Sequence, residues 1–433
     1  MEIINNSKTN SNFLFVDSSI SEKNLMGFIS TNKNCRVISF DFESADILKK
    51  CNIKFEHSET FLNNFDYTDL QNKIYKISLW CENSYISEFL IYKNINIGKL
   101  FYDQLLDYLV KSCKNIFEIK TIHEAFSESK YFVSPNLHFI ISQFSKNVSL
   151  IYDENLKSDN EQIKLNLKFK NFNKSISLSQ KKYKKIKFFA DKLLSSTFSP
   201  SLKKTNSRRL LLVEFDAFKY GNFFNHLANS GLELVFYGIR RPAFWNYRTF
   251  SNIVKSKCKI INSSLISPKT SEQFLNNFDD FKIKFNKLWN QTEILNSIFQ
   301  IDNFSMWSII ENDIKNLLES EIKSSINYID NIFENFQKYN IDGICILSEI
   351  GYTEQLTIAA AKHMKIPTFL IQHGVYYDTA NANKMNHSQG IYPIESDFYL
   401  CYGLPQKNDC VTNSNIPDSK IIPVGTIQFD ELT

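Results

Sequence analysis

The stretch Ile366-Pro-Thr-Phe-Leu-Ile-Gln-His-Gly374 is an apolar run that ends in a titratable ring and a glycine. Its length and apolar content predict a buried β-strand with His373 at the carboxyl end. Open α/β sheets build their binding sites outside the carboxyl ends of their strands. Six of the 11 glycines also fall at or after Gly343, which concentrates backbone freedom in this part of the chain. We therefore expect a sheet and its site in the last fifth of the sequence.

The segments around this strand continue the α/β pattern. Apolar runs at residues 342–347, 396–402 and 420–425 predict further strands, and residues 352–364 predict a helix. A strand, a helix and a strand in succession imply a parallel sheet with a right-handed crossover.

Two earlier parts of the chain show the same alternation. In the first part, two strands at residues 12–17 and 35–40 are predicted, joined by a helical connection. In the second, strands at residues 209–215 and 232–237 flank a helix, and Gly231 is expected to end that helix. Residues 137–142 predict either a strand or the start of a buried helix. Aromatic residues recur at helical spacing within 274–289, which is typical of a core face rather than a ligand site.

These patterns predict an α/β protein with Rossmann-like parallel sheets flanked by helices. The expected organisation is an amino-terminal α/β region at 1–152, a linker or small subdomain at 153–207, and an α/β domain at 208–425. The last domain would contain a helical insertion at 270–338, and residues 426–433 would begin an interdomain linker. A chain of 433 residues is long enough for several such domains.

Composition excludes several classes of protein. The net charge of +4 is too small to indicate nucleic acid, and eight scattered cysteines without a CxxC pair favour neither zinc nor disulfides. Without a signal peptide or a long apolar run, a cytoplasmic protein is expected. Four lysines interleaved with Tyr183 and Ile186 could contact anionic lipid at the inner face of the membrane, or form a solvated helix face. They are Lys181, Lys182, Lys184 and Lys185.

The loop between the strand at 342–347 and the following helix carries candidate ligand-binding residues. Its backbone amides and the helix amino terminus would point toward the site, where an anionic group could bind. Glu349 stands at the strand tip, and we expect it to act in catalysis. Gly351, Tyr352, Thr353 and Glu354 are candidates for substrate binding. Alternatively, Thr353 caps the helix and Glu354 simply complements its dipole.

His373 is the leading candidate for acid or base chemistry, because an imidazole titrates near neutrality. The flanking Gly374 would allow close approach of a substrate, and Tyr377 in the polar loop beyond is a candidate for the same pocket. A histidine that is only hydrogen-bonded within the sheet is the alternative. The glycine-rich phosphate loops of the GxGxxG and GxxxxGK[ST] kinds are absent.

Taken in order, these motifs resemble a family. The strand ending in Gln372-His373-Gly374, a long polar loop, the strand Ser396-Asp-Phe-Tyr-Leu-Cys-Tyr402 and the run Ile422-Pro-Val-Gly-Thr-Ile-Gln-Phe-Asp430 look like the end of the amino-terminal domain of GT-B glycosyltransferases. The chain is most similar to those that make capsular and other surface polysaccharides, to CDP-glycerol glycerophosphotransferases, and to UDP-N-acetylglucosamine 2-epimerases. The spacing from Gly425 to Asp430 matches the family's VTGxxxxD pattern, but a Val stands where the family has Thr.

The resemblance implies an acceptor-side half in which His373 activates an acceptor hydroxyl and Gln372 and Gly374 shape the same pocket. It implies transfer of a sugar or polyol phosphate from a nucleotide donor to a glycan, with the donor as substrate and no cofactor. The family's nucleotide-binding domain would follow Thr433, so a truncated form, or one completed by another polypeptide, is expected. A non-catalytic binding or assembly subunit and a sugar-nucleotide epimerase are the alternatives.

Overall fold

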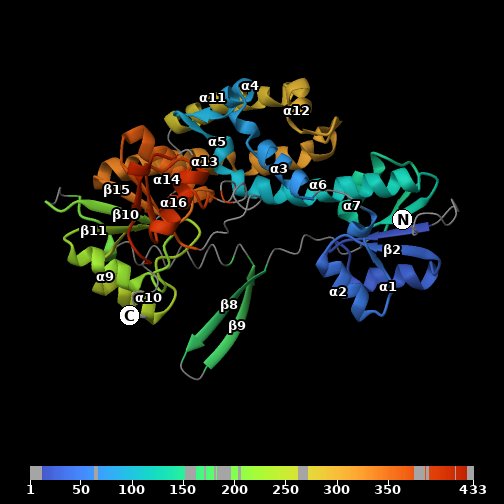
Figure 1. Cartoon of the computed structure of the whole chain (residues 1–433), viewed down its shortest axis with the longest axis horizontal. Coiled ribbons are helices and arrows are strands. Elements are labelled where there is room, and N and C mark those ends of the chain that lie inside the picture. The colour runs from blue at the N-terminus through green and yellow to red at the C-terminus, as the bar shows by residue number, and fades with distance from the viewer. Residues whose placement is uncertain are drawn as a thin grey trace. The chain divides into compact units, whose positions relative to one another are not determined.

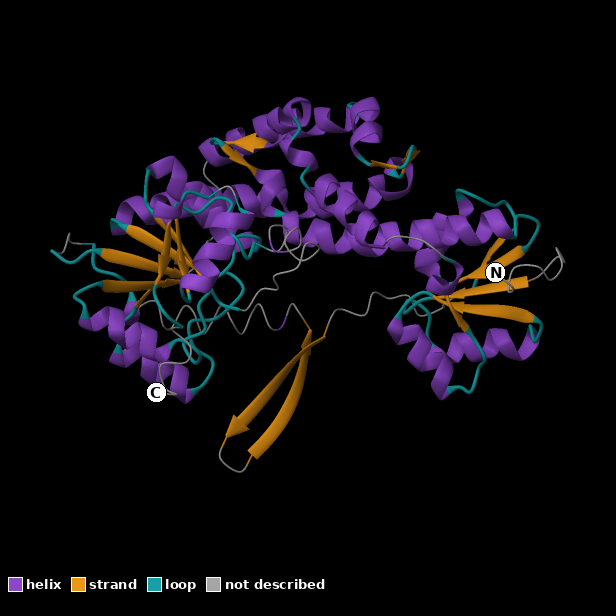
Figure 2. Ribbon diagram, in the orientation of Figure 1, coloured by secondary structure: helices purple, strands orange, loops and turns teal. Residues whose placement is uncertain are grey.

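The computed structural model describes residues 12–62, 67–151, 162–169, 172–179, 182, 197–202, 206–261, 272–374, 386, 390–414 and 416–426. The chain divides into two compact units, each containing one parallel sheet flanked by helices (Figures 1 and 2). Unit 1 comprises Met1–Ile77, Leu106–Asp159 and Leu295–Ile314, and unit 2 comprises Ser78–Leu105, Asn160–Ile294 and Lys315–Thr433. The predicted α/β class with two Rossmann-like parallel sheets is confirmed.

Unit 1 contains a five-stranded sheet in the order β3-β2-β1-β6-β7, with every neighbouring pair parallel. Its strands and main helices are β1 (Asn12–Val16), α1 (Glu22–Thr31), β2 (Cys35–Ser39), α2 (Phe42–Lys50), β3 (Glu56–His57), α3 (Tyr67–Ser78), α6 (Tyr102–Ala125), β6 (Lys130–Val133), α7 (Pro135–Ser142) and β7 (Val148–Leu150). The ambiguous segment at 137–142 is therefore helical, with Leu137, Ile140 and Ile141 buried. Leu14 and Val16 pack under α1 and α2, because alternate strand residues face the same side.

Unit 2 contains a seven-stranded parallel sheet in the order β12-β11-β10-β15-β16-β17-β18. The strands and their connecting helices are β10 (Arg209–Val213), α9 (Gly221–Asn229), β11 (Glu233–Tyr237), α10 (Tyr247–Lys255), β12 (Lys259–Ile261), β15 (Gly343–Ile346), α14 (Tyr352–Met364), β16 (Thr368–Ile371), β17 (Phe398–Cys401), α16 (Leu404–Asn413) and β18 (Ile421–Pro423). Gly231 follows α9 with a φ of 83°, as expected for the residue that ends a helix.

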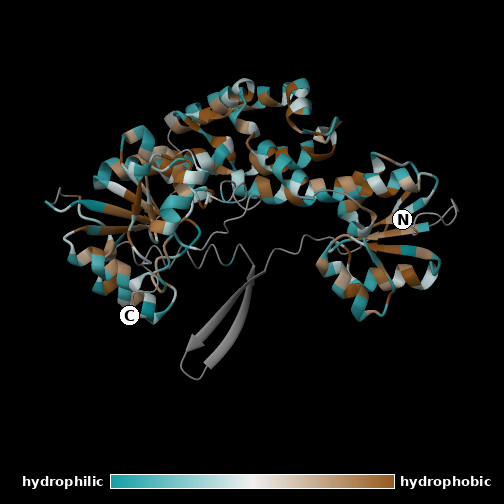
Figure 3. Cartoon of the chain, in the orientation of Figure 1, coloured by the Kyte–Doolittle hydropathy of each residue, from teal (hydrophilic) through white to brown (hydrophobic). Residues whose placement is uncertain are grey.

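The two faces of this sheet are covered by different helices. Phe224 of α9 and Ile253 of α10 share a core with Leu212, while α14 packs against β10 and β15 on the other face. The sheet is therefore buried on both sides, which explains its continuous apolar strands. Figure 3 shows that the covering helices mix apolar and polar residues, as amphipathic helices do.

The remaining described helices include α4 (Ser84–Leu90), α5 (Ile97–Leu100), α11 (Glu272–Asn286), α12 (Thr292–Ile298) and α13 (Trp307–Tyr339). Short strand pairs β4 (Ile91–Tyr92) with β5 (Ile95–Asn96), and β13 (Gln300–Ile301) with β14 (Phe304–Ser305), connect these helices. Phe274, Phe281 and Phe285 are at most 5% exposed, so the aromatic stripe is core, as predicted.

The segment predicted as a linker or small subdomain contains an antiparallel hairpin of β8 (Gln162–Phe169) and β9 (Phe172–Ser179). Among the helices of the described ranges, none has both the length and the apolar composition that crossing a bilayer requires.

Candidate functional site

The candidate site lies at the carboxyl edge of the seven-stranded sheet, where the chain reverses its direction of winding. The strands that follow β10 directly, β11 and β12, lie on one side of it, while β15 and β16 lie on the other. Loops leaving β10 and β15 therefore separate at this point, which is where open α/β sheets bind their ligands. His373 follows β16, one strand beyond β15.

His373 is exposed and lines a pocket of about 180 Å³. The described lining residues are Leu370, Ile371, Gln372, His373, Gly374, Ile391 and Tyr399. The buried Gln372 side chain holds this turn: it donates to the carbonyl oxygen of Gly374 at 2.9 Å and accepts from the amide of Tyr402 at 2.8 Å. Gln372 thus fixes the backbone on both sides of the histidine.

The pKa of His373 is lowered, first by partial burial of the ring and second by the positive charge of Arg241. Both effects disfavour the imidazolium form. At neutral pH the ring is consequently neutral and able to accept a proton. Tyr377, predicted to shape the same pocket, lies outside the described residues.

Glu214 organises the loop after β11, although sequence reasoning did not single it out. It directly follows β10 with a φ of 55°, and its side chain is buried. Its carboxylate accepts the backbone amides of Ile239, Arg240 and Arg241 at 2.7, 2.8 and 2.9 Å. These contacts place two arginines at the carboxyl edge of the sheet.

Thr353 joins this cluster instead of capping its helix. Its hydroxyl donates to Glu214 Oε1 at 2.8 Å, and the N-cap of α14 is Gly351, without a side-chain capping bond. The alternative capping role for Thr353 is therefore wrong. The hydroxyl instead links the start of α14 to the end of β10, across the point where the chain reverses.

Glu354 is a buried carboxyl group with one engaged oxygen. Oε1 accepts from Arg240 Nη2 at 2.5 Å, whereas Oε2 has no hydrogen-bond partner among the described residues. Burial raises the pKa of Glu354 to about 7, against the opposing charge of Arg240 and with a further contribution from the charge of Glu214. Near neutral pH this group can therefore carry or release a proton.

Gly351 provides the space that this ion pair occupies. A Cβ at this position would lie against Glu354 Oε2 and only 2.8 Å from Arg240 Nη2. The φ of −69° is accessible to any residue, so the requirement for glycine is steric. The predicted substrate-binding residues Gly351, Thr353 and Glu354 thus form one cluster with Arg240 and Glu214.

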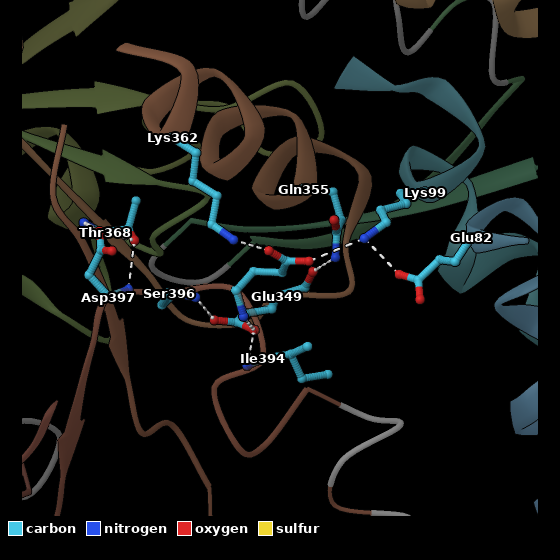
Figure 4. A network of polar contacts seen from close by, with 10 residues as sticks. Glu82, Lys99, Glu349, Gln355, Lys362, Thr368, Ile394, Ser396 and Asp397 are labelled. Carbon is cyan, nitrogen blue, oxygen red and sulfur yellow. Dashed lines mark hydrogen bonds and ion pairs between the residues drawn. The ribbon is translucent and has the colours of Figure 1, made fainter. Parts of the chain in front are cut away.

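Glu349 has a different setting from the one expected for a catalytic group. Its buried carboxylate accepts the backbone amides of Ile394, Glu395 and Ser396 at 2.6, 2.9 and 2.8 Å (Figure 4). Burial raises its pKa, while these amide bonds oppose the rise. With both oxygens engaged, the carboxylate holds the loop before β17 in place.

The same loop is tied to α14 and to the segment around α5. Glu395 pairs with Lys362 and with Lys99, and Lys99 also pairs with Glu82 (Figure 4). Tyr352 is the first residue of α14 and contacts the segment that follows α5. Its hydroxyl donates to Ser325 of α13 at 3.0 Å, and its ring packs on Phe101. Tyr352 does not line the described pocket.

Arg240 and Arg241 are the functional candidates that sequence reasoning missed. A usable signal existed, because both arginines and Glu214 come directly after apolar strand runs. Charged residues in such positions gather at one sheet edge when the strands are parallel.

No protein-family model matches this chain, and a search of curated proteins finds no significant match.

Proposed function

We propose that this chain is a GT-B-type glycosyltransferase of cell-surface polysaccharide synthesis. It would transfer a sugar or polyol phosphate from a nucleotide-activated donor to a glycan acceptor. The observation that carries the proposal is the position of His373, exposed on a pocket at the carboxyl edge of a doubly wound sheet. The resemblance of the surrounding motifs to glycosyltransferases supplies the reaction class.

His373 is the proposed base. Its neutral imidazole accepts the proton of the acceptor hydroxyl while that oxygen forms a bond to the transferred carbon or phosphorus. The bond to the leaving phosphate breaks at the same centre, and the phosphate oxygen retains the electron pair. The lowered pKa supports this role, because the unprotonated ring predominates at pH 7.

Arg241 is the proposed partner of the leaving phosphate. Its side chain is exposed, and its charge already acts on His373. A fixed cation near the departing oxygen stabilises the charge that develops during transfer. Arg241 donates through Nη1 to the carbonyl oxygen of Glu214 at 3.1 Å, whereas Arg240 is paired with the carboxylate of Glu354.

Glu349 and Gln372 are the proposed positioning residues. Glu349 fixes the loop at 394–396, and Gln372 fixes the backbone that carries the histidine. The nucleotide donor is a substrate in this reaction and no cofactor is invoked. Since such donors are cytoplasmic metabolites, the proposal includes a cytoplasmic location.

A donor panel tests the proposal. The full chain is incubated with UDP-, GDP-, CMP- and dTDP-linked sugars and with CDP-glycerol, each with and without oligosaccharide acceptors. The masses of the products are then measured by mass spectrometry. The proposal predicts an acceptor whose mass rises by one transferred group, with release of the nucleotide. Conversion of a donor without an acceptor would instead indicate an epimerase, and binding without turnover a non-catalytic subunit.

A further inference from the structure

An exposed, largely aromatic surface lies along α10 and on the segments just before α9 and α10. Phe218, Trp245, Tyr247, Phe250 and Val254 are 43%, 57%, 79%, 37% and 45% exposed. Contiguous apolar patches of this kind are uncommon on proteins that remain free in water and mark interaction sites. We call these five residues, with Arg248 and Lys255, the aromatic–basic surface.

Helix α10 has one broad apolar stripe that is buried along one edge and exposed along the other. Thr249 and Ile253 are fully buried toward the sheet, whereas Tyr247, Phe250 and Val254 recur at i, i+3 and i+7 on the exposed side. A helix that only covers a sheet needs an apolar stripe no wider than the covered face. The ring of Phe250 contacts Phe244 and Phe198, but Tyr247 and Val254 extend the stripe of α10 beyond the buried face into solvent.

Neighbouring aromatic groups extend the stripe toward the carboxyl edge of the sheet. The rings of Phe218 and Trp245 have centroids 6.2 Å apart, and the guanidinium of Arg248 lies 4.9 Å from the centre of the Phe218 ring. The cation thus covers an apolar ring while its charge stays in solvent, an arrangement that suits a boundary between water and apolar material.

The charged residues around this surface are predominantly basic. Residues 206–261 contain nine Lys or Arg and three Asp or Glu, an excess larger than the net +4 of the whole chain. Each of the three acids is engaged by its own neighbours: Glu214 by backbone amides, Glu233 by Arg209, and Asp216 by the amide of Phe218. The exposed charges beside the stripe are cationic, including Lys219, Arg248 and Lys255.

We propose that the aromatic–basic surface docks on an anionic lipid bilayer. A neutral glycan would stack on the rings but leave the cations unmatched, and an acidic polymer would pair with the cations but leave Val254 and Phe250 in water. A bilayer interface satisfies both, since Trp and Tyr favour the headgroup level and Lys and Arg attract anionic lipid. This docking is independent of the proposed transfer reaction.

Vesicle sedimentation tests the docking. The full chain is mixed with vesicles of equal parts phosphatidylglycerol and phosphatidylcholine, or of phosphatidylcholine alone, and the bound fraction is measured. Wild-type protein is expected to bind the anionic vesicles and to bind neutral ones far more weakly. Trp245→Ser combined with Tyr247→Ser should lower the partition coefficient on the order of tenfold or more. Arg248→Gln combined with Lys255→Gln should lower it about fivefold per charge.

Matched controls separate this surface from others. Phe42→Ser removes an aromatic ring that is 85% exposed in unit 1 and should leave binding unchanged. Replacing Lys181, Lys182, Lys184 and Lys185 by Gln tests the lysine-rich segment, of which only Lys182 is described. Circular dichroism of the variants at Phe42, Trp245, Tyr247, Arg248 and Lys255 should match the wild type, because those side chains are exposed.

Several outcomes would overturn the proposal. The first is that the wild-type protein does not bind anionic vesicles. The second is that the double variant Trp245→Ser and Tyr247→Ser binds them as well as the wild type does. The third is that only the variant of the lysine-rich segment loses binding to the vesicles. Concentration-dependent dimerisation that Trp245→Ser abolishes, in a protein that does not bind vesicles, would identify a second copy of the chain as the occupant. Oligosaccharide binding at Trp245 without vesicle binding would identify a glycan.

Discussion

Arg240 donates a 2.5 Å hydrogen bond to one carboxylate oxygen of Glu354, whose second oxygen is buried without a hydrogen-bond partner in the described part of the chain. This pair joins the loop after β11 to the first turn of α14, at the reversal point of the sheet. A half-satisfied buried carboxyl group is unfavourable to folding, so its presence at the carboxyl edge of the sheet is consistent with a site.

Glu354→Gln should change how stability depends on pH. The folded-state pKa of about 7 lies above the ordinary value of 4.5, so the folded protein holds a proton that the unfolded chain has released. Wild-type stability should therefore fall as pH rises from 4.5 to 7, by about 3 kcal/mol relative to the variant. Urea unfolding followed by tryptophan fluorescence across this range measures the difference, and parallel curves for the two proteins would contradict the assignment.

Gly351→Ala should destabilise unit 2 by about 1–3 kcal/mol, because the new methyl group would displace the Arg240–Glu354 pair. Gly374→Ala is the matched control: it lies at the same sheet edge, and its added Cβ would meet nothing within 4 Å. Thermal unfolding should separate the two variants. Equal stability for both would show that the pair moves aside without penalty.

Glu349→Ala should loosen the loop before β17. Removing the carboxylate leaves the amides of Ile394, Glu395 and Ser396 without their acceptor, at a cost of about 1–3 kcal/mol. Hydrogen exchange of these amides should accelerate on the order of tenfold or more. Exchange in β10 provides the internal control, and uniform acceleration through unit 2 would indicate global destabilisation instead of local release.

His373 should titrate below the ordinary histidine pKa of 6.5, since partial burial and Arg241 both disfavour its charged form. Arg241→Gln should raise that pKa, whereas Arg248→Gln, which removes a charge from the aromatic–basic surface, should leave it unchanged. NMR titration of the imidazole carbons measures each value. If the pKa of His373 were unchanged in the Arg241→Gln protein, the charge of Arg241 would not act on this imidazole.

The sequence alone was sufficient to predict the strands and the position of His373. Apolar runs bounded by glycine, proline and polar residues mark buried strands, and parallel topology then determines which end carries the site. The strand that follows Pro367, Thr368–Ile371, has His373 just beyond its carboxyl end, as the apolar run indicates.

The partners of the candidate residues could not be predicted from the sequence. Thr353 binds Glu214 across 139 positions, and Glu349 binds amides 45 to 47 positions away. Such contacts depend on strand order and on the packing of α14 across β10 and β15, which local patterns do not encode. The helix-capping alternative for Thr353 was a reasonable local reading, but the tertiary contact replaced it.

The central claim is that His373 accepts the acceptor proton, and the rate of group transfer by His373→Gln and His226→Gln proteins tests it most directly. His226 is exposed in the last turn of α9, which runs back toward the opposite edge of the sheet, so it controls for loss of an imidazole. With the donor and acceptor found in the panel, His373→Gln should transfer on the order of 10²–10⁴-fold more slowly than wild type, and His226→Gln at the wild-type rate. Equal rates for all three proteins would contradict the account.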